Sequence, residues 1–277
     1  MVAMRGQLDI YSDFLLASFS LATATCLSKL LDGDLSHDAI TRFLRENEFT
    51  ARELWKLAKP LVRKYERPTG VLIFDDTIIE KPYTDENDLI CWHWDHSKER
   101  NVKGIGLLSA FYHSEELCVP VNYQLILKTE RYRDEKTGKE KRRSTQTKNE
   151  QLRQMLSRCI QNRVSFAYVL ADAWFASTDN IHFIADKKKH FIFEIKCNRH
   201  AATSKEDKLA GRWLCIKDLG VAENSQQTVW LKGVKFPLLL IRQVFTNKDG
   251  SKGERYLITN DLELNFDQTT TIYKRRC

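Results

Sequence analysis

Residues 71–77, with the letters VLIFDDT, decide the fold of this chain. Four apolar residues in a row that lead into Asp75 and Asp76 are typical of a buried strand that ends at a polar edge. Residues 166–172, with the letters FAYVLAD, repeat this pattern and end at Asp172. We therefore expect two buried strands, each of which ends at a carboxylate.

The other regular elements follow in a definite order. Apolar runs at residues 105–112 and 117–127, joined by a short polar link, predict a hairpin. Apolar residues at helical spacing predict helices over residues 150–161 and 177–188, and residues 191–195 predict a further strand. This order of strands and helices predicts an α/β fold with a ribonuclease-H-like mixed sheet, although other α/β folds share parts of it.

The two acidic strands are neighbours in such a sheet, so their carboxylates converge. Oxygen ligands suit Mg²⁺, and a pair of such ions stabilises both the attacking and the leaving oxygen at a phosphorus. Because successive strand residues point to opposite faces, only one of Asp75 and Asp76 should face the site. The alternative interpretation is that these aspartates cap turns or helices.

Three segments carry a resemblance to a known family. Residues 74–82 (FDDTIIEKP) look like the first catalytic segment of DDE insertion-sequence transposases, and residues 170–175 (LADAWF) look like the second. Residues 273–276 (YKRR) resemble the opening of the third segment, a helix with Tyr-x-x-Arg-x-x-x-Glu and a later Lys. The resemblance covers about residues 30 to 276 and places the glutamate at position 280, beyond Cys277. We therefore expect a chain that is truncated before its third catalytic carboxylate.

The resemblance also implies an activity and its site residues. Asp76, the aspartate before the threonine, and Asp172 become the catalytic residues and the ligands of Mg²⁺, for which Mn²⁺ can substitute. The implied reaction is hydrolysis at the ends of the element, followed by attack of the freed 3′-hydroxyl on target DNA. Tyr273 and Arg276 are implied to lie near the DNA phosphates. Loss of the third ligand predicts impaired strand transfer, because small geometric errors in such sites are costly.

Two other functions stay open at this point. A non-catalytic remnant that binds DNA would occupy the ends of the element or inhibit intact copies of the transposase. A ribonuclease-H-like nuclease with a different third ligand would use Glu194 or Glu263, although neither falls where the resemblance places the final helix.

The charge distribution favours DNA as the partner. The formal net charge is +7 and the isoelectric point is about 9.0, and Lys and Arg gain affinity by displacing counterions from phosphates. An ordinary basic soluble protein has the same balance. Residues 128–148 hold nine Lys or Arg against four Asp or Glu. Arg142 and Arg143 in this run, together with Lys274, are candidate DNA contacts, or parts of solvated charged segments.

Two aromatic features are further candidates. Tyr256 is a candidate for stacking on an extruded base, or it is a core or edge-strand tyrosine. Residues 91–96 read CWHWDH, so Cys91, His93 and His96 suggest zinc, but their spacing is too short for a usual structural site. The same segment can instead border the active-site groove, or its two tryptophans can simply pack.

The sequence predicts four segments. Residues 1–67 are expected to be a helical, DNA-binding module, in which Ser36 and the pair Thr50 and Glu53 cap helices. A helix-turn-helix or a plain helical bundle fits this stretch equally. Residues 68–197 form the ribonuclease-H-like core, residues 198–262 a β-rich insertion, and residues 263–277 the start of the final core helix.

The remaining expectations concern location and partners. Seven scattered cysteines without a C-x-x-C pair fit free thiols in a reducing cytosol. Apolar runs are too short to cross a bilayer, so we expect a cytoplasmic, nucleoid-associated protein without a membrane partner. The expected partners are double-stranded DNA, both the terminal inverted repeats of the element and its target, and, in a homodimer, a second copy of the chain.

Overall fold

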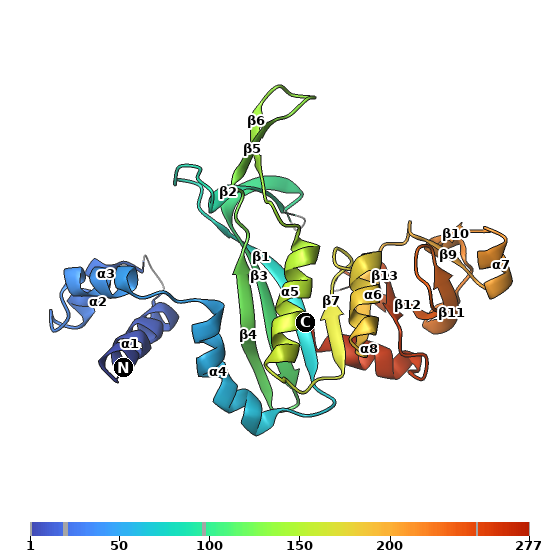
Figure 1. The fold of residues 1–277 in the computed structure, drawn as a ribbon, viewed down its shortest axis with the longest axis horizontal. Coiled ribbons are helices and arrows are strands. Elements are labelled where there is room, and N and C mark those ends of the chain that lie inside the picture. Colours follow the sequence, from blue (N-terminus) through green and yellow to red (C-terminus); the bar gives the residue numbers. More distant parts are fainter. Residues whose placement is uncertain (1, 19–21, 96–97, 248, 277) are drawn as a thin grey trace. The chain divides into compact units, whose positions relative to one another are not determined.

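The computed structural model of the protein describes residues 2–18, 22–95, 98–247 and 249–276. The chain forms two compact units, Met1–Glu53 and Leu54–Cys277 (Figure 1). Each unit is built around its own core, and each is described by itself. The four segments predicted from the sequence stay a prediction beside this division.

The first unit is helical. It contains α1 (Val2–Ala17), α2 (Ala24–Leu30), α3 (His37–Glu46) and the first turn of α4 (Ala51–Tyr65). Ser36 caps α3 as the sequence predicts, because its hydroxyl oxygen accepts a hydrogen bond from the Ala39 amide at 3.2 Å. A small apolar core holds the unit together, and its buried members are Phe14, Leu27 and Ile40. Across the described parts of the chain, every helix is too short or too polar to span a bilayer.

The second unit contains one large mixed sheet. Its strands run in the order β10-β9-β11-β12-β13-β8-β7-β1-β3-β2, and β4 pairs with β3 beside this path. The pairs β1–β7 and β7–β8 are parallel, and the other pairs of this sheet are antiparallel. The strands are β1 (Val71–Glu80), β2 (Ile90–Asp95), β3 (Arg100–Ser114), β4 (Leu117–Leu125), β7 (Tyr168–Ala171), β8 (His190–Ile195), β9 (His200–Ala202), β10 (Leu214–Cys215), β11 (Ser225–Leu231), β12 (Leu238–Thr246) and β13 (Lys252–Thr259).

Helices cover both faces of this sheet, and a separate small ribbon leaves it. The ribbon pairs β5 (Glu130–Arg133) with β6 (Glu140–Arg143) and extends beyond the sheet edge (Figure 1). The helical elements after it are α5 (Lys148–Gln161), α6 (Thr178–Asp186), α7 (Lys205–Leu209), the 3-10 turn η1 (Ile216–Asp218) and α8 (Phe266–Lys274). A mixed α/β unit with a large mixed sheet is therefore present, as the sequence predicts.

Alternation along β1 divides the core into two layers. Leu72 and Phe74 belong to the larger cluster, together with Leu156 of α5. Val71 and Ile73 belong to the smaller cluster on the other face, which also contains Tyr273 of α8. Side chains of odd number on β1 therefore face α8, and those of even number face α5. This alternation decides which way each of the following two aspartates points.

Two differences from the sequence analysis concern this sheet edge. We expected β1 to end at Asp75 or Asp76, but it continues to Glu80, because its second half pairs with β3 as far as Gly104. Only a glycine fits at that position, since a Cβ on Gly104 would lie 2.4 Å from the Ile79 carbonyl oxygen. Residues 90–95, for which we predicted no strand, form β2 against β3. Both aspartates therefore lie inside a strand.

Candidate active site

The register of two parallel strands brings the candidate carboxylates together. Ile73 of β1 pairs with Leu170 of β7, so Asp75 and Asp172, each two residues further on, continue along neighbouring strands on the α8 face. Asp172 follows the last residue of β7, where the chain turns: the Phe175 amide donates to the Asp172 carbonyl oxygen at 3.2 Å. The sheet topology thus brings Asp75, the alternative to Asp76, to the same face as Asp172.

The Asp172 carboxylate is partly buried, and its surroundings act on its pKa in both directions. Burial raises the pKa of its carboxyl, while the Arg276 guanidinium and the Trp174 amide lower it in part. The charges of Asp76 and then Asp75 raise the pKa again, so both aspartates of β1 lie within electrostatic reach of Asp172. The Trp174 amide donates to Asp172 Oδ1 at 2.9 Å and fixes the orientation of the carboxylate.

Arg276 joins the carboxylates on the α8 face. Its Nη2 donates to Asp75 Oδ1 at 2.9 Å and lies 3.8 Å from Asp172 Oδ2. Tyr273, one turn earlier, lies with its hydroxyl oxygen 3.5 Å from Arg276 Nη1 and 3.4 Å from the Ala171 carbonyl oxygen. The last turn of α8 therefore places one positive charge over two neighbouring strands.

Asp76 points to the other face and has its own cation. The Lys148 ammonium group donates to Asp76 Oδ2. Lys148 is the first residue of α5, and the capping box formed by Thr147 and Glu150 fixes the start of that helix. The Lys148 ammonium group also lies 5.9 Å from the centre of the Trp174 ring. Each of the two aspartates of β1 is thus paired with a cation, Asp75 with Arg276 just after α8 and Asp76 with Lys148 of α5.

The donor chemistry of this site fits a hard divalent cation. Asp75, Asp76 and Asp172 supply carboxylate oxygens, the ligand type that Mg²⁺ and Mn²⁺ prefer, and all three side chains are partly exposed. Within the described residues, no group of three or more His, Cys, Asp or Glu side chains is arranged to hold a metal ion. The cations of Lys148 and Arg276 instead balance these carboxylates, so a bound ion would displace or rearrange them.

The structure corrects two of the predicted DNA contacts. Tyr273 is fully buried beneath α8, and Tyr256 is 5% exposed within the larger core cluster. Neither ring is presented to a base or a phosphate, because Tyr256 belongs to the larger core cluster and Tyr273 to the smaller one. Tyr256 is therefore the core tyrosine of our alternative interpretation. The hydroxyl of the buried Tyr273 contacts the Arg276 guanidinium.

The three other predicted cations differ in how available they are. The Arg142 side chain is 11% exposed and pairs with Glu86 and Asp88. Arg143 is 66% exposed and pairs with Glu130 at 2.7 Å, and Lys274 at the end of α8 is exposed. Arg143 and Lys274 are thus accessible to a polyanion, whereas Arg142 holds together the segment before β2 and the ribbon.

The aromatic segment of residues 91–95 lies at the edge of the sheet. Cys91 and His93 are buried with the Sγ and Nε2 atoms 3.4 Å apart, and His96 lies outside the described residues. Trp92 and Trp94, on the opposite face of β2, are each about half exposed. The tryptophans are therefore not core residues, and their rings are available at the surface.

Sequence reasoning missed two members of the site and left a third open. Lys148 received no role, although it starts the helix that follows the basic run, and Asp75 was given only as the alternative to Asp76. Glu194 lies with its Oε2 3.5 Å from the Tyr273 hydroxyl, on β8 beside β7. The strand alternation predicted that Asp75 and Asp76 point to opposite faces, and the resemblance then selected Asp76.

This arrangement is consistent with a ribonuclease-H-like nuclease. A family model described as "DDE superfamily endonuclease" matches residues 2–230, and the chain belongs to this family. Among curated proteins no significant match is found. The crystal structure of the NurA nuclease from Sulfolobus solfataricus is similar at 9% sequence identity, covering 81% of this chain and 82% of that one with a TM-score of 0.32. A likeness this low carries no conclusion about fold or activity.

Proposed function

We propose that the protein is the DNA transposase of an insertion sequence, which cleaves a DNA strand at the ends of its element and joins the freed 3′-hydroxyl to target DNA. The observation that carries this proposal is that Asp76 of β1, whose side chain points to the α5 face, lies within electrostatic reach of Asp172 at the end of the neighbouring strand β7, in a chain of the DDE endonuclease family. Both carboxylates belong to segments that resemble the catalytic segments of such transposases.

In this proposal Asp76 and Asp172 hold Mg²⁺, or Mn²⁺ in its place. Such an ion activates the attacking oxygen and stabilises the leaving oxygen at the scissile phosphate. The Trp174 amide holds the Asp172 carboxylate in a fixed orientation. Lys148 and Arg276, which pair with the carboxylates in the free protein, turn to the non-bridging oxygens of the bound phosphodiester.

The proposed partner is double-stranded DNA, as inverted repeats of the element and as target. Support comes from the net charge of +7 and from the exposed cations Arg143 and Lys274. A homodimer on paired ends belongs to the same proposal. The third acidic ligand that the resemblance implies stands at no position among residues 1–277, so two carboxylates are assigned here.

A strand-cleavage assay tests the proposal. A labelled duplex that contains the inverted repeat is incubated with the protein in Mg²⁺ and, separately, in Mn²⁺, and nicked product with a 3′-hydroxyl is measured. Asp76→Asn and Asp172→Asn should each lower the nicking rate by about 100-fold or more while leaving DNA affinity within about twofold. Asp85→Asn, an exposed carboxylate in the segment between β1 and β2, is the matched control.

The same assay separates the proposal from its rival. DNA binding by the wild-type protein, without nicking in either metal, would support the non-catalytic DNA-binding function instead. Nicking that survives both Asp76→Asn and Asp172→Asn would show that other residues carry the chemistry.

A further inference from the structure

A second polar site lies in the same unit, between strand β2 and the β5–β6 ribbon. It is a pocket of about 550 Å³, within the range of about 300–1,000 Å³ that small-molecule sites occupy. Its walls are Glu86, Cys91, Trp92, Asn101, Lys128, Tyr132, Lys139, Glu140, Lys141 and Arg142. None of these residues belongs to the candidate active site.

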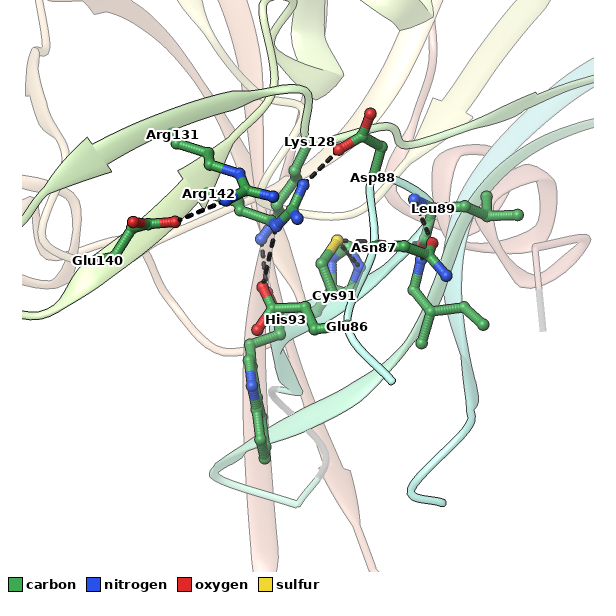
Figure 2. A network of polar contacts seen from close by, with 12 residues as sticks. Glu86, Asn87, Asp88, Leu89, Cys91, His93, Lys128, Arg131, Glu140 and Arg142 are labelled. Atoms are coloured by element: carbon green, nitrogen blue, oxygen red, sulfur yellow. Dashed lines mark hydrogen bonds and ion pairs between the residues drawn. The ribbon is translucent and has the colours of Figure 1, made fainter. Parts of the chain in front are cut away.

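Ion pairs fix the frame of this pocket. Arg142 pairs with Glu86 at 3.5 Å and with Asp88, and Arg131 pairs with Glu140 at 3.2 Å (Figure 2). These contacts connect the ribbon to the segment that precedes β2. The pocket is therefore built by a preorganised network, in which Arg142 pairs with two carboxylates and Glu140 pairs with Arg131.

Two lysines of the pocket stand outside these ion pairs, although the charge of Glu86 also acts on Lys128. Lys128 and Lys139 form no ion pair within the parts of the chain that the structure describes. The Lys128 ammonium group donates to the Trp92 carbonyl oxygen, which holds it at the wall and leaves it with two further N–H donors. Lys128 is partly buried and Lys139 is exposed. Cations outside an ion pair favour an anionic ligand, and phosphate is the anion that lysine commonly binds.

Two aromatic rings stand at the same pocket. Trp92 is 52% exposed and Tyr132 is 38% exposed. Exposed rings beside cations are the combination with which proteins bind unpaired nucleotides, because the rings stack on bases while the cations hold the backbone. An inorganic anion would pair with the lysines without stacking on the rings. An apolar ligand would contact the rings without pairing with the lysines.

The pocket adjoins the candidate active site through β2. His93, the neighbour of Trp92 on that strand, has its pKa lowered to about 4 by burial and then by the charges of Lys128 and Lys148. One of these lysines lines the pocket and the other pairs with Asp76. Lys128 and Lys148 thus lie within electrostatic reach of the same imidazole.

We propose that this pocket binds one unpaired nucleotide of a DNA strand, with its base against Trp92 or Tyr132 and its phosphate on Lys128 and Lys139. The inference rests on the proposed function, because that function supplies DNA as the ligand. It adds a nucleotide-binding site away from the cleavage point. The chemistry recognised is an aromatic base joined to a phosphate, which a free nucleotide also offers.

Fluorescence anisotropy with two single-stranded probes tests this site. The first probe is a labelled oligothymidylate, and the second is an abasic oligomer of the same length, which keeps the phosphates and lacks the bases. Wild-type protein should bind oligothymidylate about 5- to 150-fold more tightly than the abasic oligomer, the effect of one base–aromatic stack. Trp92→Ala or Tyr132→Ala should remove most of that difference.

Matched variants separate the pocket from the surface around it. Trp94→Ala removes a half-exposed tryptophan from the same face of β2 as Trp92, and Tyr83→Ala removes a fully exposed tyrosine. Neither of these residues lines the pocket. Both should keep the preference for oligothymidylate. Lys128→Ala and Lys139→Ala should weaken both probes alike and lower the salt dependence. Unchanged thermal melting of each variant shows that the fold is retained.

The outcomes are distinct. Equal binding of the two probes by wild-type protein, or an equal loss with Trp94→Ala, would overturn the proposal while DNA binding and cleavage stand. Displacement of the oligomer by thymidine monophosphate at equal nucleotide concentration would overturn the assignment to a strand in favour of a free nucleotide. Absence of any DNA binding would overturn the proposed function together with this inference.

Discussion

The guanidinium of Arg276 lies between Asp75 and Asp172, 2.9 Å from Asp75 Oδ1 and 3.8 Å from Asp172 Oδ2. The two aspartates come from the neighbouring parallel strands β1 and β7, and the arginine comes from the end of α8. One cation therefore neutralises carboxylates that would otherwise repel each other. A divalent ion held by Asp172 must compete with that charge.

Replacement of Arg276 should therefore strengthen metal binding. Arg276→Gln removes the competing charge and should raise the Mn²⁺ affinity roughly fivefold, corresponding to about 1 kcal/mol for a partly exposed ion pair. The loss of the free Mn²⁺ signal in electron paramagnetic resonance measures this affinity. Arg276→Lys keeps the charge and should change the affinity less. A weaker Mn²⁺ affinity in Arg276→Gln would show that the arginine organises the carboxylates more than it competes with the ion.

Tyr273 and Lys274 should respond differently, although they are adjacent in sequence. Tyr273 is fully buried, so Tyr273→Phe should leave DNA affinity within about twofold. Lys274 is exposed, so Lys274→Ala should weaken DNA binding uniformly across sequences and reduce the salt slope by about 1. Anisotropy titrations at several salt concentrations measure both effects. The opposite order of the two variants would argue that the end of α8 changes conformation on DNA.

Arg142 and Arg143 form a second pair of neighbours with separate roles. Arg142 pairs with Glu86 and Asp88 and is nearly buried, so Arg142→Ala should lower stability by about 1 kcal/mol. Arg143 is exposed, so Arg143→Ala should change stability by less than about 0.5 kcal/mol and weaken DNA binding instead. Urea denaturation and DNA titration of the two variants check this division. Equal destabilisation by both would contradict it.

Stability should depend on pH through His93. Burial and the nearby lysines lower the pKa of His93 from 6.5 to about 4, so the folded protein favours the neutral ring. The unfolded chain takes up the proton first, so this contribution to stability is intact above pH 6.5 and is lost as the pH falls towards 4. The loss is about 3 kcal/mol in total.

The variant His93→Gln isolates this effect, because Gln has no titratable group. Denaturation midpoints of the wild-type and variant proteins between pH 4 and 7 should converge as the pH falls. Parallel pH profiles for the two proteins would show that His93 does not titrate in this range, or that other groups dominate.

The sequence was sufficient to predict the two parallel strands and the aspartates that follow their apolar runs. Continuous apolar runs before Asp75 and Asp172 mark buried strands, and the structure places these runs side by side in β1 and β7. The capping residue Ser36 was likewise predicted, because its hydrogen bond to the Ala39 amide depends on local geometry alone. Features that depend on one short stretch of chain are therefore accessible without a structure.

Features that depend on distant partners were not accessible. β1 continues past its aspartates because Gly104, on β3, allows the backbone of Ile79 to approach, and nothing in residues 71–80 indicates this. Tyr256 and Tyr273 were assigned to DNA although both are core residues, because an isolated tyrosine gives no sign of which elements cover it. The pairing of Asp76 with Lys148 joins residues far apart in sequence.

Binding of Mn²⁺ to the wild-type protein and to Asp75→Asn, Asp76→Asn and Asp172→Asn tests the central claim most directly. Asp76 and Asp172 are the proposed ligands, so each of those two variants should lose at least about tenfold in Mn²⁺ affinity. Asp75→Asn should change the Mn²⁺ affinity by less than about threefold, because Asp75 pairs with Arg276 and is not one of the proposed ligands. Full Mn²⁺ affinity in Asp76→Asn, with a loss in Asp75→Asn, would contradict the account and assign the metal to the α8 face of β1.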